Sequence, residues 1–119
     1  MKKEIHIGVG DSVSTAKGFI NAWQSAERGK KVKVEQRLDF ENLDTLLKAL
    51  TPRRWLLLKE LRKNGPMSIR ALTKELGRDY KNVHTDVRKL ERIGLIGHTK
   101  DDKIEVPWDI VEAQLRLAA

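Results

Sequence analysis

The sequence predicts a mixed α/β protein of the α+β kind, in which a small strand-helix-strand extension precedes a mainly helical domain. Over residues 3–9 and 31–40, apolar side chains alternate with polar ones, which is the period of a half-buried strand. From residue 41 onward, leucines and valines recur every three or four residues between helix-capping residues, as in amphipathic helices. We therefore divide the 119-residue chain into an extension, residues 1–40, and a domain, residues 41–119.

The extension is expected to form a strand, a helix and a second strand. In the first strand, apolar residues alternate with Glu4 and His6. Residues 14–29 then place apolar side chains on one face of a helix, which Gly29 ends. In chain order, the apolar residues of the three elements are Ile5, Ile7, Val9; Ala16, Phe19, Ile20, Trp23; and Val32, Val34, Leu38, Phe40. So small a unit buries little surface, and we expect its open sheet edges either to pair two subunits of a dimer or to bind a different protein.

The domain begins with four predicted helices. The first has a leucine stripe, and the next three begin at Thr51 followed by Pro52, at Ser68 and at Asp79, all of which are typical of helix starts. Glycines end these three helices. The residues expected to face inward are Leu43, Leu46, Leu47 and Leu50; Trp55, Leu58 and Leu61; Ile69, Leu72 and Leu76; and Tyr80, Val83, Val87 and Leu90.

The pattern changes after Gly94. Residues 95–108 alternate around a polar tip, which predicts a small hairpin. Asp109 is then expected to cap a short closing helix over residues 110–118. One tryptophan is expected in the core of each part of the chain: Trp23, Trp55 and Trp108.

Charge and composition restrict the class of partner. The net charge is +7, and residues 52–99 account for all of it, with 12 Lys/Arg against 5 Asp/Glu. A concentrated basic region favours a polyanion, although a solvated basic surface has the same composition. Because the chain has no cysteine, no signal-peptide pattern and no apolar run long enough for a membrane span, we expect a cytoplasmic protein.

The fourth helix carries a polar, basic face. At about 100° per residue its four apolar residues share one side, and Thr85 points in the opposite direction. Cations and one amide lie within about 60° of Thr85, and no acid is among them. The side chains of this face are Lys81, Asn82, Thr85, Arg88, Lys89 and Arg92. His84 and Asp86 lie at its edge, where Asp86 is expected to hold the helix in place through an ion pair or hydrogen bond.

The motifs "LLKELRKNGPMSIRALTKEL" and "DYKNVHTDVRKLERIGLI", with a hairpin directly after Gly94, resemble the winged helix-turn-helix domains of small prokaryotic transcriptional regulators of the MarR-like and ArsR-like kind. The resemblance covers about residues 52–108 and is closest to predicted regulators with a short N-terminal extension, some of which act as antitoxins. Thr73 stands where alanine is usual, and its hydroxyl needs a partner. The hairpin tip, or wing, pairs two acids with two lysines, whereas wings that enter the minor groove tend to be basic.

A helix of this kind fits the major groove, where its N-terminal residues read base edges and its other cations, with those of earlier helices, contact phosphates. The expected base contacts are Lys81, Asn82 and Thr85. The expected phosphate contacts are Arg53, Arg54, Arg70, Lys74, Arg88, Lys89 and Arg92. The lysines of the wing are Lys100 and Lys103, and the two acids beside them argue against a contact of this wing with DNA.

We therefore expect a sequence-specific regulator of transcription that binds double-stranded DNA as a homodimer and represses by covering a promoter. The alternative is an antitoxin that neutralises a protein toxin through residues 1–40 and regulates its own operon. A protein-binding winged helix, and an extension that only covers the core, also stay open. No arrangement of residues suggests an enzyme, and no cofactor or metal is expected, since His6, His84 and His98 are scattered.

Overall fold

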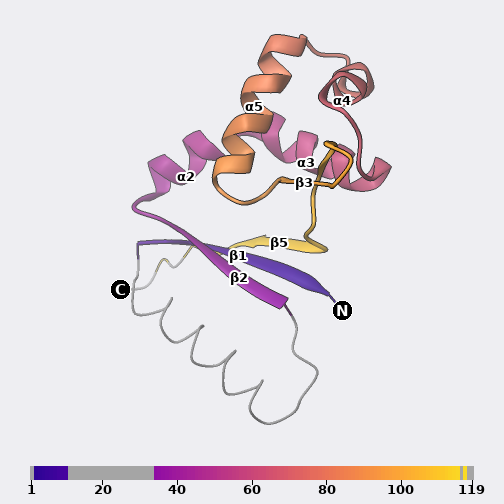
Figure 1. The fold of residues 1–119 in the computed structure, drawn as a ribbon. Helices are drawn as coiled ribbons and strands as arrows, with labels where there is room; N and C mark the ends of the chain where they lie inside the picture. The colour runs from indigo at the N-terminus through magenta and orange to yellow at the C-terminus, as the bar shows by residue number, and fades with distance from the viewer. Residues whose placement is uncertain (1, 11–33, 116, 118–119) are drawn as a thin grey trace, which may run out of the picture. The chain divides into compact units, whose positions relative to one another are not determined.

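A computed structural model describes residues 2–10, 34–115 and 117 of the chain. These residues have a mixed α+β fold, with four helices and two small sheets in the part described (Figure 1). The chain divides into two compact units, one made of residues 1–46 and 108–119 and the other of residues 47–107. The helix expected over residues 14–29 lies outside the described residues.

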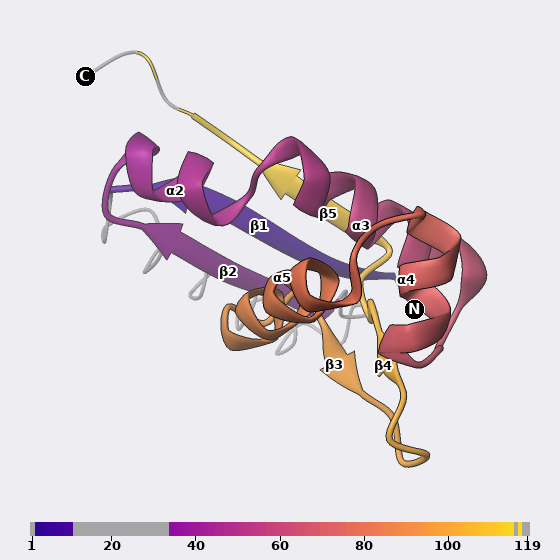
Figure 2. The ribbon, with the colours of Figure 1, turned by 90° about the horizontal axis from the view of Figure 1, so that it is seen from above.

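A three-stranded sheet organises the first unit. Its strands are β1 (Lys3–Val9), β2 (Val34–Phe40) and β5 (Ile110–Ala113), in the order β2-β1-β5. Both neighbours run parallel to β1, which lies between them (Figure 2). Ile5 and Ile7 are each only 1% exposed, because the central strand of a small sheet is the most covered one. The two strands expected in the extension are therefore confirmed, the second from residue 34 onward.

The prediction of a closing helix over residues 110–118 is wrong, because residues 110–113 form β5. Asp109 accepts a hydrogen bond from the Lys3 backbone N–H at 2.8 Å, and its own N–H donates to the Lys3 carbonyl, also at 2.8 Å. Asp109 thus begins a strand pairing where a helix cap was expected. These residues form a strand because one edge of β1 is open to pairing. The hydrogen bonds between β1 and β5 satisfy backbone groups of β1, and this long-range pairing is not visible in the local sequence pattern. Residues 108–119 consequently join the N-terminal strands.

The helix α2 (Leu43–Ala49) has a mixed surface. Leu46 and Leu50 are buried, as expected, whereas Leu43 and Leu47 are 38% and 57% exposed. The leucine stripe is therefore only half covered. Asn42 stabilises the helix start by accepting from the Thr45 N–H at 2.8 Å.

The second unit contains three further helices, α3 (Pro52–Asn64), α4 (Ile69–Leu76) and α5 (Tyr80–Arg92). All three predicted caps are confirmed. Thr51, Ser68 and Asp79 each accept a hydrogen bond from the backbone N–H three residues later. Gly77 ends α4 in the left-handed conformation at φ 62°, which glycine adopts without strain. None of the described helices has the length and apolar character that a membrane crossing requires.

The core of the second unit is built from the inner faces of α3, α4 and α5 and the start of the hairpin. Its fully buried side chains are Leu57, Leu61, Leu72, Val83, Val87, Leu90, Leu95 and Ile104. Four expected inner residues of these helices are not buried: Trp55, Ile69 and Leu76 are only half-buried, and Tyr80 is 45% exposed. Trp108, in the first unit, is buried as expected.

The expected hairpin forms from β3 (Gly97–His98) and β4 (Ile104–Glu105), which pair antiparallel. Met67, just before α4, extends this small sheet through two backbone hydrogen bonds with Ile104, of 3.1 and 2.9 Å. Within the turn, Thr99 and Lys103 are joined by a backbone hydrogen bond of 2.8 Å. The hairpin is thereby attached to the chain that enters α4.

Candidate functional site

The outward face of α5 is the most distinctive surface of the second unit. The six polar side chains expected on it are all exposed: Lys81, Asn82, Thr85, Arg88, Lys89 and Arg92. On the opposite side, Val83, Val87 and Leu90 are completely buried. The prediction of a two-sided helix is confirmed for these residues, and the exposed set contains four cations and no acid.

Thr85 lies in the middle of this face. Its hydroxyl donates to the Lys81 carbonyl at 3.0 Å, one turn back along the helix. The hydroxyl proton is therefore already used within α5, as is common for threonine in helices. The methyl group and an oxygen lone pair are what Thr85 has left for a ligand.

An ion-pair cluster holds α5 from behind. The Asp86 carboxylate accepts hydrogen bonds from Nε of Arg54 at 3.1 Å and from Nη2 of Arg78 at 2.7 Å. All three side chains are less than 20% exposed. Arg54 also donates to the carbonyls of Ala49, at 2.8 Å, and Lys48, at 3.2 Å. The expectation that Asp86 holds the helix in place is confirmed. The cluster fixes the start of α3, the turn before α5 and the middle of α5 together.

Arg54 is consequently placed differently from the other cations. It is only 8% exposed, and its guanidinium is occupied by Asp86 and two carbonyls. A phosphate contact requires an exposed arginine. Arg54 is instead buried and pairs with groups of the protein itself, so it does not fit the expected phosphate contact. Arg53, the neighbouring residue on α3, is exposed.

Glu91 connects α5 to the hairpin. Its carboxylate lies 2.6 Å from Nε2 of His98 on β3 and 3.2 Å from Nη1 of Arg88. Asp102, at the hairpin tip, lies 3.8 Å from the other ring nitrogen of His98. Arg88 is therefore partly neutralised, whereas the other cations of the face form no ion pair with any residue that the structure describes. The pairing of Arg88 with Glu91 could be predicted from their i,i+3 spacing on a helix. The contact of Glu91 with His98 could not, because it depends on how the chain turns at Gly94.

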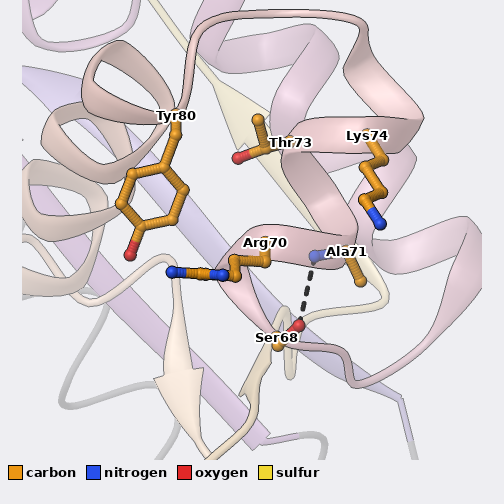
Figure 3. Close-up of a pocket in the computed structure, with 6 residues that line it drawn as sticks. All are labelled: Ser68, Arg70, Ala71, Thr73, Lys74 and Tyr80. Atoms are coloured by element: carbon orange, nitrogen blue, oxygen red, sulfur yellow. Dashed lines mark hydrogen bonds between the residues drawn. The ribbon is translucent and has the colours of Figure 1, made fainter.

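A groove runs beside α4 and the first turn of α5 (Figure 3). Its volume is about 620 Å³, and Ser68, Arg70, Ala71, Thr73, Lys74 and Tyr80 line it. The Arg70 guanidinium lies 5.9 Å from the centre of the Tyr80 ring, within the range of a cation–π interaction. A smaller groove of about 230 Å³ shares Ser68, Arg70 and Tyr80 and reaches Arg88, His98 and the hairpin.

Tyr80 is a site residue that sequence reasoning missed. Its spacing from Val83 and Val87 placed it on the apolar stripe, but it is the first residue of α5 and lies at the end of that stripe. An aromatic residue directly after a helix cap, between Asp79 and Lys81, is the signal that was available. The groove therefore has an aromatic wall next to the basic face.

The remaining predicted residues are also exposed. Lys74 lines the larger groove, and Lys100 and Lys103 lie at the hairpin tip beside Asp101 and Asp102. The Thr73 hydroxyl finds its partner within α4, donating to the Ile69 carbonyl at 2.8 Å. This threonine is thus accommodated without disturbing the helix.

Comparisons with known proteins place this site inside a shared sequence region. The model of the HVO_A0114 family matches residues 49–113, more than half of the chain. The match runs from the last residue of α2 to the last residue of β5 and includes the whole of α5 and the hairpin. Searches of curated proteins and of solved structures found no match.

Proposed function

The chain belongs to the HVO_A0114 family, and we propose that its residues 47–107 are a winged helix-turn-helix that binds double-stranded DNA through α5. One observation carries the proposal: six exposed polar side chains, four of them cationic, share the side of α5 that lies opposite its buried valines and leucine. A helix has the width of the major groove, and cations beside it release counterions from the phosphates.

The order of elements supports this proposal. A helix, a shorter helix that ends at Gly77, a short turn, a further helix and a hairpin follow one another in α3, α4, α5 and β3-β4. In a helix-turn-helix the last of these helices enters the groove while the earlier ones cross the backbone. The ion pairs of Asp86 with Arg54 and Arg78 hold α5 at a fixed angle, which a reading helix needs.

The side chains of the face suit different parts of a duplex. Lys81, Asn82 and Thr85 lie in the first turns of α5, where base contacts are usual, and a lysine suits guanine, an asparagine adenine and a methyl group thymine. The cations proposed to contact phosphates are Arg53, Arg70, Lys74, Lys89 and Arg92, together with Arg88, which Glu91 partly neutralises. Arg54 is no longer part of this set.

We extend the proposal to regulation: two copies of the chain set their α5 helices in successive major grooves and repress a promoter by covering it. Such pairs bind half-sites about 10 base pairs apart, so the protein's twofold symmetry is matched by a palindrome in the DNA. The hairpin takes a secondary part, because Asp101 and Asp102 offset Lys100 and Lys103 at its tip.

The experiment is selection from a random pool of duplex DNA by the full chain, followed by sequencing, at two salt concentrations. The expected result is an enriched palindrome whose affinity falls steeply with salt. The matched variants are Lys89→Ala, on the face, and Lys63→Ala, an exposed lysine at the end of α3. Weak binding without a motif, or equal losses in both variants, contradicts the proposal.

A further inference from the structure

The sheet of the first unit gathers acidic side chains around one histidine. In a parallel sheet, residues in register share a face, and the registers Glu4↔Glu35 and His6↔Glu112 bring these four side chains to the same side. Ile5 and Ile7 occupy the opposite side and are buried. The polar face thus combines an imidazole with carboxylates from all three strands.

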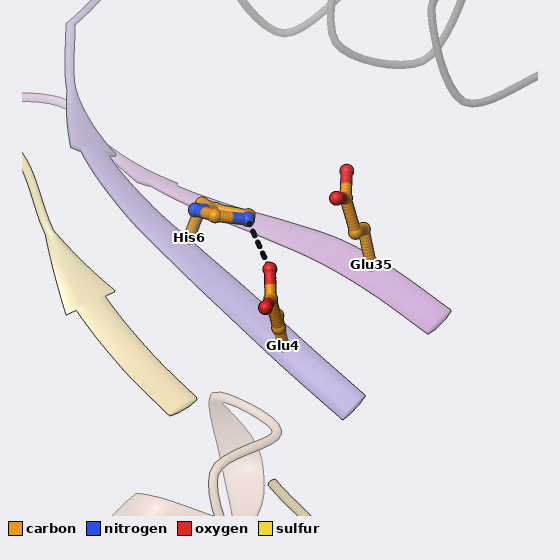
Figure 4. A group of neighbouring side chains, drawn as sticks. All are labelled: Glu4, His6 and Glu35. Atoms are coloured by element: carbon orange, nitrogen blue, oxygen red, sulfur yellow. Dashed lines mark ion pairs between the residues drawn. The ribbon is translucent and has the colours of Figure 1, made fainter. Parts of the chain in front are cut away.

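The distances within this group suit a cation. One donor atom each from Glu4, His6 and Glu35 lies within 4.8 Å of the others, and Nε2 of His6 is 3.5 Å from Oε2 of Glu4 (Figure 4). Two ligands of a tetrahedral metal with bonds of about 2.1 Å are about 3.4 Å apart. The histidine and Glu4 therefore already stand at the spacing of two ligands of one ion, and Glu35 needs only a side-chain adjustment to join them.

The second nitrogen of His6 provides independent support. Nδ1 lies 3.5 Å from Oε2 of Glu112 on β5. Histidines that bind metals usually donate their other ring N–H to a carboxylate, which fixes the ring and raises the basicity of the ligating nitrogen. Glu112 occupies that place, and it leaves Nε2 directed toward Glu4.

The burial of Glu4 points the same way. This residue is only 8% exposed, and within the described part of the chain its carboxylate has His6 as its one ion-pair partner. Arg37, in register with His6, pairs with Asp39 at 3.5 Å instead. The Glu4 side chain itself is 11% exposed, and a carboxylate so largely removed from water is costly unless a positive charge balances it, as a bound cation does.

We propose that Glu4, His6 and Glu35 bind a first-row divalent metal ion, with Zn²⁺ the best fit, and that Glu112 positions His6. An imidazole with carboxylates suits zinc and its neighbours, whereas magnesium and calcium prefer oxygen ligands alone. Water completes the coordination beyond the three ligands that the described residues supply. The ion joins β1 to β2 and is separate from the DNA-binding proposal, because all four residues belong to the first unit.

The test is calorimetric titration of the metal-free full chain with zinc chloride. We expect one ion per chain, an affinity at least 10-fold lower in His6→Gln and Glu35→Gln, and about 10-fold lower in Glu112→Gln, a typical cost for an outer-shell partner. His98→Gln is the matched control, since His98 also lies beside two carboxylates, Glu91 and Asp102, but in the second unit. That variant should bind zinc as the unchanged chain does.

A second measurement needs no variant. In the ¹⁵N spectrum of the imidazoles, zinc should shift Nε2 of His6 and leave His98 unchanged, and magnesium should shift neither. The proposal is overturned if the chain binds no zinc at about 100 μM, a concentration well above the dissociation constants of ordinary zinc sites in proteins. It is equally overturned if His6→Gln binds zinc undiminished or if the zinc-dependent shift belongs to His98. In that case His6 only pairs with Glu4 and Glu112.

Discussion

Arg54 and Asp86, 32 residues apart, form an ion pair of 3.1 Å that joins the first turn of α3 to the middle of α5. The pair explains why the basic, exposed face of α5 stays in one orientation, because Asp86 points inward and is held there by Arg54. Both side chains are nearly buried, at 10% and 14% exposure. Such a pair matters most when one partner is removed.

We expect Asp86→Ala to lower the free energy of unfolding by about 3 kcal/mol, because it leaves the guanidiniums of Arg54 and Arg78 buried without a countercharge. Urea denaturation of the full chain measures this. Asp101→Ala, at the exposed hairpin tip, is the control and should unfold as the unchanged protein does. If the two variants unfold alike, the cluster does not hold α5.

Arg54→Ala should weaken DNA binding only to the extent that it unfolds the second unit.

Base and phosphate contacts respond differently to mutation. Lys81→Ala and Asn82→Ala should each cost about 1 to 3 kcal/mol of binding free energy on the selected sequence and relax the preference at one position. Lys89→Ala should weaken selected and random duplexes alike and reduce the salt slope by about 1. Fluorescence anisotropy with both duplexes at several salt concentrations distinguishes these results. Equal losses on the two duplexes for Lys81→Ala and Asn82→Ala remove them from base reading.

Thr85 allows a sharper test, because its hydroxyl proton already serves the Lys81 carbonyl. Thr85→Val keeps the methyl group and should retain binding to the selected sequence. Thr85→Ser loses the methyl group and should cost about 0.8 kcal/mol, the value of one buried methylene. Replacing the opposing thymine with uracil should cost the unchanged protein the same amount. A loss in Thr85→Val that exceeds the loss in Thr85→Ser indicates that the oxygen is what contacts DNA.

The pair of Arg70 and Tyr80 predicts an effect on affinity with little effect on folding, since both side chains are exposed. Tyr80→Leu should lower DNA affinity by about 0.5 to 1 kcal/mol, the value of an exposed cation–π contact that orients Arg70. Tyr80→Phe retains the ring and should bind normally. Anisotropy and urea denaturation of the same two variants separate affinity from stability. Binding that is unchanged in Tyr80→Leu excludes a role for the ring.

Locally encoded features of the fold could be predicted from the sequence. The caps at Thr51, Ser68 and Asp79 depend on a side chain and a backbone N–H three residues away, so the pattern contains all that determines them. The two-sided character of α5 is local for the same reason. Tyr80 departs from the pattern only because the core does not extend to the helix end.

Long-range pairing accounts for the features that could not be predicted. The sequence pattern of residues 110–113 is compatible with a helix, and these residues form a strand because they pair with the open edge of β1. Arg54 carries no sign in the sequence that its countercharge lies on α5. Glu4 and His6, two residues apart on a strand, were bound to share a face, but Glu35 joins them only through the register of β1 with β2. For that reason the sequence alone did not group a third carboxylate or imidazole with Glu4 and His6.

The pairing of β5 with β1 has a consequence for the order of events during synthesis. The hydrogen bond from Lys3 to Asp109 closes a loop of 106 residues, whereas the second unit is one continuous stretch, residues 47–107. During translation the second unit is complete before β5 leaves the ribosome, so it can fold first, and its local contacts favour speed. Until residues 110–113 have been made, β1 has one edge without its β5 partner, and during this interval that edge is open to wrong partners.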